Sequence, residues 1–202
     1  MEFKAIIDPK SRVLTDCAVV GVYENGDLGA AARNIDAQTG GLIKQLHTGG
    51  DFAAKTGDTL LLPRPAGAAS ARVLLVGLGS RTGFDRKQYR KALLSSAQAL
   101  AKTGAANAVV YLALEAIAGV DVQYRARMVA EIFSAQGYKI PDLKSGAKPK
   151  PAKLTSVSVA AENARALKGA AMGLKIGAAI GSAMAMSRDL ANLPPNICTP
   201  TY

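Results

Sequence analysis

The sequence predicts an α/β protein built as a three-layer sandwich around a mostly parallel β-sheet. Short apolar segments bounded by Asp, Pro, Asn or Gly, which are typical of strands, alternate with segments of helical spacing. Such alternation favours parallel strands joined by helices that cross over the sheet. The 202 residues allow one domain with an appendage, and 49% of them are hydrophobic, which is enough for a core.

Four strands are expected in the first half, over residues 3–7, 17–23, 59–62 and 72–76. Residues 28–46 between the second and third have helical spacing that breaks at Gly40-Gly41. One helix followed by a short second helical turn is therefore expected there.

A helix is predicted from Asp85, which can cap it, to about Lys102. Its buried stripe is formed by Tyr89, Leu93, Ala97 and Leu100. A strand over 107–114 and a helix over 122–135 follow. The residues of that helix expected to face the core are Tyr124, Met128, Val129 and Ile132.

Residues 137–153 are rich in Lys, Pro and Gly and are expected to form an exposed loop or hairpin. A strand over 154–159 and a long Ala/Gly helix over about 162–191 complete the pattern. In that helix Gly173, Gly177 and Gly181 repeat every four residues, as in transmembrane dimers. Lys175 at its centre and the Ala/Gly composition argue against insertion into lipid, so we expect close packing on a protein surface and no membrane.

The chain is basic, with 25 Lys and Arg against 15 Asp and Glu and a net charge of +10. This excess favours anionic partners, and nucleic acid is one such partner. A solvated basic surface is the alternative. The residues predicted to contact nucleic acid form two groups, Arg81, Arg86, Lys87, Arg90 and Lys91, and Lys144, Lys148, Lys150 and Lys153.

The segment Gly77-Leu78-Gly79 resembles part of a dinucleotide-binding fingerprint. Its next glycine, Gly83, is one residue too far along for G-x-G-x-x-G, and Glu115 comes too late to be the acidic partner. We therefore predict a core strand and turn rather than a phosphate cradle.

No catalytic or metal-binding residue is predicted in the chain. His47 is the single histidine, Cys17 and Cys198 lie far apart, and no serine has a G-x-S-x-G context. The acidic residues show no clustering typical of a metal site. The N-terminus lacks the pattern of a secretion signal, so a cytoplasmic protein with free thiols is expected.

The C-terminal stretch SRDLANLPPNICTPTY resembles the run that opens the catalytic domain of leucyl aminopeptidases, the two-metal family that includes bacterial aminopeptidase A. The matching positions are Arg188, Asp189, Leu190, Asn192, Pro194, Asn196 and Pro200. Upstream, VLLVGLG with Phe84-Asp85-Arg86 and Tyr89, together with TGDTLLLP, is similar to the amino-terminal domain of that family.

This resemblance implies a macro-domain-like α/β domain over 1–160, a connecting helix over 161–191 and the start of the catalytic domain over 192–202. In the family, Lys, Asp and Glu of the catalytic domain hold two divalent metals, manganese or zinc. The signature Asn-Thr-Asp-Ala-Glu-Gly-Arg of that domain does not occur here, so no catalytic or metal residue is carried over. The family forms cytoplasmic hexamers, and some bacterial members also bind DNA.

The leading functional hypothesis is a non-catalytic domain that serves assembly and regulation of a leucyl aminopeptidase. On this hypothesis the chain alone is inactive, contacts its own catalytic domain and homo-oligomer partners, and meets peptide substrates only through that domain. One alternative is a DNA-binding accessory module for transcription or recombination. Another, resting on fold analogy alone, is a macro-like pocket for ADP-ribose at the Gly77 turn.

Overall fold

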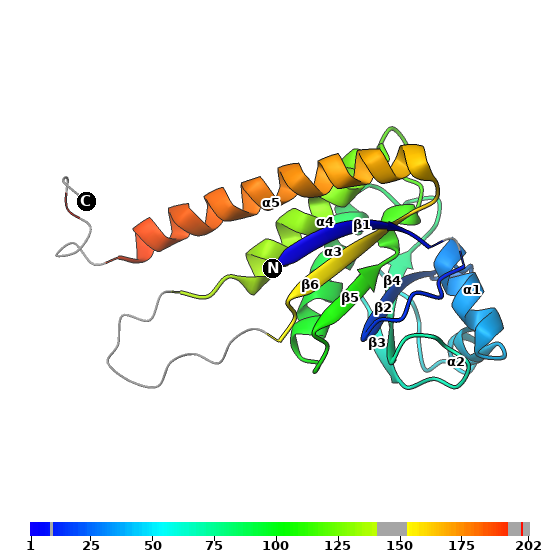
Figure 1. The fold of residues 1–202 in the computed structure, drawn as a ribbon. Helices are drawn as coiled ribbons and strands as arrows, with labels where there is room; N and C mark the ends of the chain where they lie inside the picture. The colour runs from blue at the N-terminus through cyan, green and yellow to red at the C-terminus, as the bar shows by residue number, and fades with distance from the viewer. Residues whose placement is uncertain (9, 141–152, 194–198, 200–202) are drawn as a thin grey trace.

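The computed structural model describes residues 1–8, 10–140, 153–193 and 199. Within them a six-stranded sheet has the order β1-β6-β5-β2-β4-β3, and helices cover both of its faces (Figure 1). The strands are β1 (Glu2–Ile7), β2 (Cys17–Tyr23), β3 (Thr59–Pro63), β4 (Arg72–Gly79), β5 (Asn107–Val110) and β6 (Ser156–Ala161). The helices are α1 (Ala30–Gln38), α2 (Leu42–Thr48), α3 (Arg86–Ala101), α4 (Val122–Gly137) and α5 (Ala164–Asn192).

The sheet is parallel except at one edge, where β3 pairs antiparallel with β4. The α/β fold with a mostly parallel sheet and a long final helix is thus confirmed. Strand β2 lies at the centre, and every one of its residues is buried. Cys17 and Val19 face the core beneath α3, α4 and α5, whereas Ala18 and Val20 face the core beneath α1 and α2.

The larger helices begin at side chains that satisfy free backbone amides. The Asp85 carboxylate accepts hydrogen bonds from the amides of Lys87 (2.6 Å) and Gln88 (3.0 Å), as the sequence predicted for α3. Asp121 and Asn163 begin α4 and α5 in the same way. The predicted stripe of α3 is buried throughout. On α4 Met128, Val129 and Ile132 are buried, and Tyr124 is partly buried against the same core.

Several boundaries differ from the sequence prediction. The strand expected over 107–114 ends at Val110, because Tyr111 takes a helical conformation (φ −89°, ψ −6°) and the 3₁₀ helix η1 (Leu112–Leu114) follows. The segment 28–46 forms two helices, α1 and α2, separated at Gly40-Gly41 as expected. Strand β4 continues to Gly79, so Gly77 lies inside the strand rather than in a turn. Of the predicted loop 137–153, residues 141–152 lie outside the described part of the chain.

Helices α4 and α5 lie side by side in the same direction, joined by a seam of glycines (Figure 1). A Cβ added to Gly173 would lie 2.1 Å from the carbonyl oxygen of Gln123. One added to Gly177 would lie 2.3 Å from that of Arg127, and Gly181 is equally crowded by α4. The four-residue glycine repeat therefore serves close packing on a protein surface, here within the chain itself, as the sequence predicted.

Helix α5 also has the length and apolar composition of a membrane-crossing helix. Its most apolar 18-residue window has a mean hydropathy of 1.3, and 28% of that window is buried in the domain. The buried residues of α5 are Ala170, Gly173, Leu174, Gly177 and Gly181, which include the seam against α4. Packing within the domain thus accounts for the small apolar residues on this side of the helix. The absence of a membrane stays a prediction.

Candidate functional site

The crevice between the carboxyl ends of β2 and β4 is the position where open α/β sheets usually bind ligands. Strand β2 leads to α1 on one face of the sheet, whereas β4 leads to α3 on the opposite face. Neighbouring strands whose connections diverge in this way leave a gap outside their ends.

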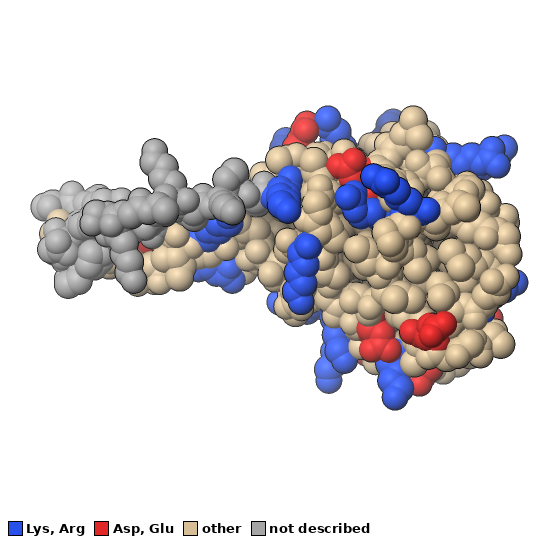
Figure 2. Space-filling view, turned by 90° about the horizontal axis from the view of Figure 1, so that it is seen from below, with Lys and Arg blue, Asp and Glu red and all other residues tan. Residues whose placement is uncertain are grey.

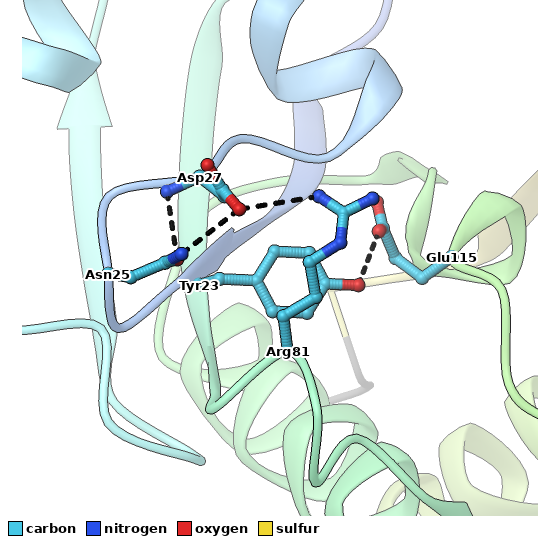
Figure 3. A network of polar contacts seen from close by, with 5 residues as sticks. All are labelled: Tyr23, Asn25, Asp27, Arg81 and Glu115. Carbon is cyan, nitrogen blue, oxygen red and sulfur yellow. Dashed lines mark hydrogen bonds and ion pairs between the residues drawn. The ribbon is translucent and has the colours of Figure 1, made fainter.

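A network of polar side chains lies at this end of the sheet (Figure 3). Tyr23, at the end of β2, donates a 2.9 Å hydrogen bond from its hydroxyl to Oε2 of Glu115. The guanidinium of Arg81, in the segment after β4, lies 5.2 Å from the centre of the Tyr23 ring and 3.6 Å from Oδ2 of Asp27. Asn25 donates a 3.0 Å hydrogen bond to the same Asp27 oxygen. The network joins three segments that are far apart in the sequence.

Glu115 is the buried charge of this network, with 7% of its surface exposed. Burial raises the pKa of its carboxyl above the ordinary value, although the Tyr23 hydrogen bond and the charges of Arg81, Arg33 and Arg125 oppose the shift. Burial, together with the neighbouring Glu115 charge, also raises the pKa of the Tyr23 hydroxyl. A carboxyl with a raised pKa keeps its proton to a higher pH than a surface carboxylate does.

The Glu115 carboxylate also lies close to the start of α1. A Cβ added to Gly29, the residue that caps α1, would lie 1.9 Å from Oε1 of Glu115. The first turn of a helix attracts anions, because its free amides and the helix dipole both favour negative charge. A carboxylate of the protein itself therefore lies beside the first turn of α1.

The glycine-rich end of β4 is filled in a similar way. The amide of Gly79 donates a 3.0 Å hydrogen bond to the carbonyl of Ala54. A Cβ added to Gly77 would lie 2.1 Å from the carbonyl oxygen of Lys55. The glycines therefore allow another segment of the chain to approach the strand closely. This geometry agrees with the prediction of a core strand rather than a phosphate cradle.

The cations predicted to contact nucleic acid have different surroundings. Arg81 belongs to the polar network, and the guanidinium of Arg86 lies 5.0 Å from the centre of the Tyr124 ring. Lys87, Arg90 and Lys91 are exposed on one face of α3 and have no ion-pair partner within the described part of the chain. Whether any of these residues contacts nucleic acid stays a prediction.

The second predicted group of cations consists of lysines that lie away from the start of α3 or outside the described residues. Lys144, Lys148 and Lys150 fall in the range 141–152 that the structure does not describe. Lys153 is exposed, and it lines a cleft of about 380 Å³ together with Ala101 at the end of α3. Helix α3 has 16 residues, so its end, which lies near Lys153, is about 24 Å from its start, which carries Arg86 and Lys87. Figure 2 shows basic side chains spread over the face that it displays, with carboxylates between them.

The described residues do not suit a metal centre. No group of three His, Cys, Asp or Glu side chains comes together among residues 1–8, 10–140, 153–193 and 199. His47 lies on α2, where its Nδ1 donates to the carbonyl of Phe52 (3.0 Å). Cys17 is buried in the sheet, and Cys198 lies outside the described part. The two divalent metals implied by the resemblance therefore have no binding site in these residues.

The C-terminal motif gathers on a residue that the sequence analysis missed. Arg188, Asp189 and Asn192, at the end of α5, all contact Tyr138, which follows α4. The sequence contains the spacing of the polar residues in the motif, but this spacing does not identify Tyr138 as the residue they contact. Pro194, Asn196 and Pro200 of the motif lie outside the described residues.

Comparison with curated proteins gives consistent relatives. The chain is 38% identical over 202 residues to a probable cytosol aminopeptidase of Halorhodospira halophila, covering 100% of this chain and 40% of the relative. It is 41% identical over 192 residues to that of Alkalilimnicola ehrlichii, covering 94% of this chain and 38% of the relative. The chain thus spans about two fifths of the length of these relatives.

Solved structures show the same relationship. The bottromycin maturation enzyme BotP matches with a TM-score of 0.66 and 27% identity, over 93% of this chain and 35% of that one. BotP has also been solved in complex with Mn. A mutant of tomato leucine aminopeptidase matches in fold with a TM-score of 0.75, at 21% identity, over 100% of this chain and 40% of that one.

The sequence profile described as "Cytosol aminopeptidase family, N-terminal domain" matches residues 19–147. This range begins within β2, continues past α4 and includes the polar network at the ends of β2 and β4. The chain belongs to the cytosol aminopeptidase family and corresponds to the N-terminal domain of its members.

Proposed function

We propose that this chain is the non-catalytic assembly domain of a two-metal aminopeptidase that removes N-terminal residues from peptides. The exposed end of α5 is the observation that carries this proposal. Beyond Gly181 no residue of α5 is buried, and Met184, Met186 and Leu190 are 38%, 65% and 39% exposed. Met186 and Leu190, four residues apart, lie on the same side of the helix. Exposed apolar side chains on one side of a projecting helix typically mark an interface.

The remainder of the enzyme is the occupant that fits this surface. The relatives are more than twice as long as this chain, and the chain matches their N-terminal domain. The polypeptide that follows this domain in those relatives continues from the end of α5, so it is the nearest protein surface available to cover the methionines. Regulation and hexamer assembly through this domain belong to the same proposal, as does a cytoplasmic location, which the name of the relatives supports.

The metal chemistry belongs to that remainder. Two divalent ions, manganese or zinc, would activate water and polarise the peptide carbonyl when bound. The described residues of this chain offer no ligand set for them. What this chain contributes is the rigid α4–α5 pair and the surface at its end, which would hold the catalytic part in its working arrangement.

A chimera tests this function. The chain replaces the matching N-terminal 40% of the Halorhodospira halophila relative. We expect the chimera to hydrolyse leucine p-nitroanilide with Mn²⁺ or Zn²⁺ and to sediment as an oligomer, whereas the 202-residue chain alone should show no turnover. Chelator-sensitive turnover by the purified chain alone would contradict the proposal.

Binding to the phosphate backbone of DNA is a second candidate, supported by one face of α3. Lys87, Arg90 and Lys91 follow the i, i+3, i+4 spacing that places side chains together on a helix, and all three are exposed. Gel shifts over a salt series should show affinity that falls as salt rises. Alanine at these three positions should weaken binding to all sequences alike, whereas alanine at Lys10, Lys44 and Lys55, which are also exposed, should not.

An ADP-ribose site is the candidate that the geometry supports least. The Glu115 carboxylate lies beside the start of α1, and atoms of Ala54, Lys55 and Thr56 fill the space beside Gly77 and Gly79. A negatively charged pyrophosphate would meet a carboxylate there. Calorimetry with ADP-ribose should therefore show no heat of binding.

A further inference from the structure

The last turns of α5 are not held by apolar packing. The glycine seam ends at Gly181, which lies against Ser134 of α4. The following residues up to Asn192 make about three further turns, and none of them is buried. Figure 1 shows this part of α5 extending beyond the rest of the domain. A helix end without a buried face would fray unless other contacts fixed it.

A cavity lies at the end of the seam, where α4 and α5 approach the start of β1. This cavity, of about 390 Å³, is lined by Ser134, Gly137 and Tyr138 on one side. Ala178, Gly181, Ser182 and Ala185 of α5 line the other side, with Met1 and Phe3 at the start of β1. Beyond the seam, the last turns of α5 contact the end of α4 through Arg188, which reaches the carbonyl of Ala135, and contact Tyr138 just after it.

Three polar residues of α5 close on Tyr138. Its hydroxyl donates a 2.9 Å hydrogen bond to Oδ1 of Asp189 and accepts one of 3.3 Å from the side-chain amide of Asn192. The guanidinium of Arg188 lies 5.3 Å from the centre of the Tyr138 ring, within cation–π range. The ring and the hydroxyl of one tyrosine are thus both engaged.

Arg188 also caps the end of α4. Its Nη1 donates a 3.3 Å hydrogen bond to the carbonyl of Ala135, one of the last carbonyls of a helix that ends at Gly137. Such carbonyls have no partner inside the helix and carry the negative end of its dipole, so a guanidinium is a favourable cap. The contact ties the two helix ends together independently of the tyrosine hydroxyl.

We infer that Tyr138 is a positioning residue and that Arg188, Asp189 and Asn192 form a clamp on it, which fixes the direction in which α5 leaves the domain. This inference rests on the proposed function, in which the catalytic part follows α5. The clamp then sets the orientation in which the catalytic part meets this domain. The Arg-Asp-Leu-x-Asn part of the C-terminal motif thereby acquires a structural task in this chain, which is to hold Tyr138.

Hydrogen exchange in the 202-residue chain tests the clamp without any enzymatic activity. Tyr138→Phe keeps the ring beside Arg188 but removes the hydroxyl, and Asp189→Asn removes the accepting charge. Either change should make amides of residues 185–192 exchange about threefold to tenfold faster. Amides of β4 should keep their rates, which distinguishes loss of the clamp from general destabilisation.

The double variant and a control sharpen the result. Because Tyr138→Phe already removes the hydroxyl that donates to Asp189, adding Asp189→Asn to it should accelerate exchange little further. Tyr124→Phe is the matched control, since this tyrosine lies on α4 and its ring, like that of Tyr138, lies beside an arginine. Unchanged exchange at 185–192 in both single variants, or equal acceleration by the control, would overturn the clamp.

The chimera tests the consequence for assembly. Tyr138→Phe in the chimera should lower kcat about threefold or more and leave KM unchanged, because Tyr138 orients a domain and touches no substrate. Unchanged kcat would overturn the positioning role. An inactive chimera with all clamp residues intact would overturn the proposed function instead, and the exchange measurement would still decide the clamp.

Discussion

The hydroxyl of Tyr23 donates a 2.9 Å hydrogen bond to the buried carboxylate of Glu115, and this bond joins the end of β2 to the segment that follows β5. The guanidinium of Arg81, which follows β4, lies over the ring of Tyr23 at 5.2 Å from its centre. The position where an α/β sheet would usually bind a ligand is thus occupied by a charged network of the protein itself. Stability, rather than ligand binding, is what this network is expected to affect.

The first prediction concerns the pH dependence of stability. Because burial raises the pKa of Glu115 in the folded state, its protonated form is favoured on folding. Its contribution to stability is therefore complete below the pKa of the unfolded chain and is lost as pH rises through the folded pKa. Glu115→Gln keeps an acceptor for Tyr23 and should flatten the fall in the free energy of unfolding above about pH 4.

Urea unfolding of both proteins between pH 4 and 8 measures this effect. Glu162→Gln, at an exposed carboxylate, is the control and should leave the pH profile as it is in the unaltered chain. A Glu115→Gln profile parallel to that of the unaltered chain would show that Tyr23 and the three neighbouring arginines cancel the cost of burial.

The glycine seam gives a second prediction. Gly177→Ala places a methyl group 2.3 Å from the carbonyl oxygen of Arg127 and 2.8 Å from Cβ of Ala130, so α4 and α5 must move apart. We expect a loss of about 2–4 kcal/mol in the free energy of unfolding. Gly83→Ala, where no atom lies closer than 4.0 Å, should stay within about 0.5 kcal/mol. Equal losses for the two variants would contradict the close packing.

A third prediction concerns the end of β4. Gly79 has a φ of +74°, and an added Cβ would lie 2.2 Å from Oγ1 of Thr56. Gly79→Ala should cost about 2 kcal/mol or more, from the conformation and the clash together. Gly50→Ala has the same kind of conformation (φ +85°) in open space and should cost about 1 kcal/mol. Thermal unfolding that ranks Gly50→Ala as the more damaging would refute the steric argument.

The fourth prediction concerns thiol reactivity. Burial raises the pKa of the Cys17 thiol to about 12, so almost none of it is thiolate at neutral pH. In a Cys198→Ser background the native protein should react with a disulfide reagent at pH 8 only as fast as it unfolds, and full reaction should follow in denaturant. Rapid labelling of the native protein would place Cys17 at the surface.

The alternation of apolar strands and capped helices is enough to predict the fold class, because each signal is local. The Asp85 cap and the stripe of α3 follow directly from residue spacing. The order of the strands and the antiparallel edge at β3 depend on pairing between distant segments, which the local pattern does not contain. The strand predicted over 107–114 was too long, since a buried apolar run can equally form the turn at Tyr111.

The side-chain networks were harder to predict than the fold. From the sequence, Glu115 is a candidate only for the acidic residue of a dinucleotide site at Gly77-Leu78-Gly79. Its position too far along the chain from these glycines excludes that role. Its pairing with Tyr23, which is 92 residues away, arises from the adjacent positions of β2 and β5. The contact between Tyr138 and Asp189 likewise depends on α4 and α5 lying side by side, which only the three-dimensional structure reveals.

Oxidation of Met186 is the most direct test of the central claim, that the exposed end of α5 is covered by the rest of the aminopeptidase. Met186 is 65% exposed in this chain, whereas Met128 is 4% exposed and serves as the internal control. Under dilute hydrogen peroxide, mass spectrometry should show rapid oxidation of Met186 in the chain and slow oxidation in the chimera, with Met128 slow in both. Equally rapid oxidation of Met186 in an assembled, active chimera would contradict the claim.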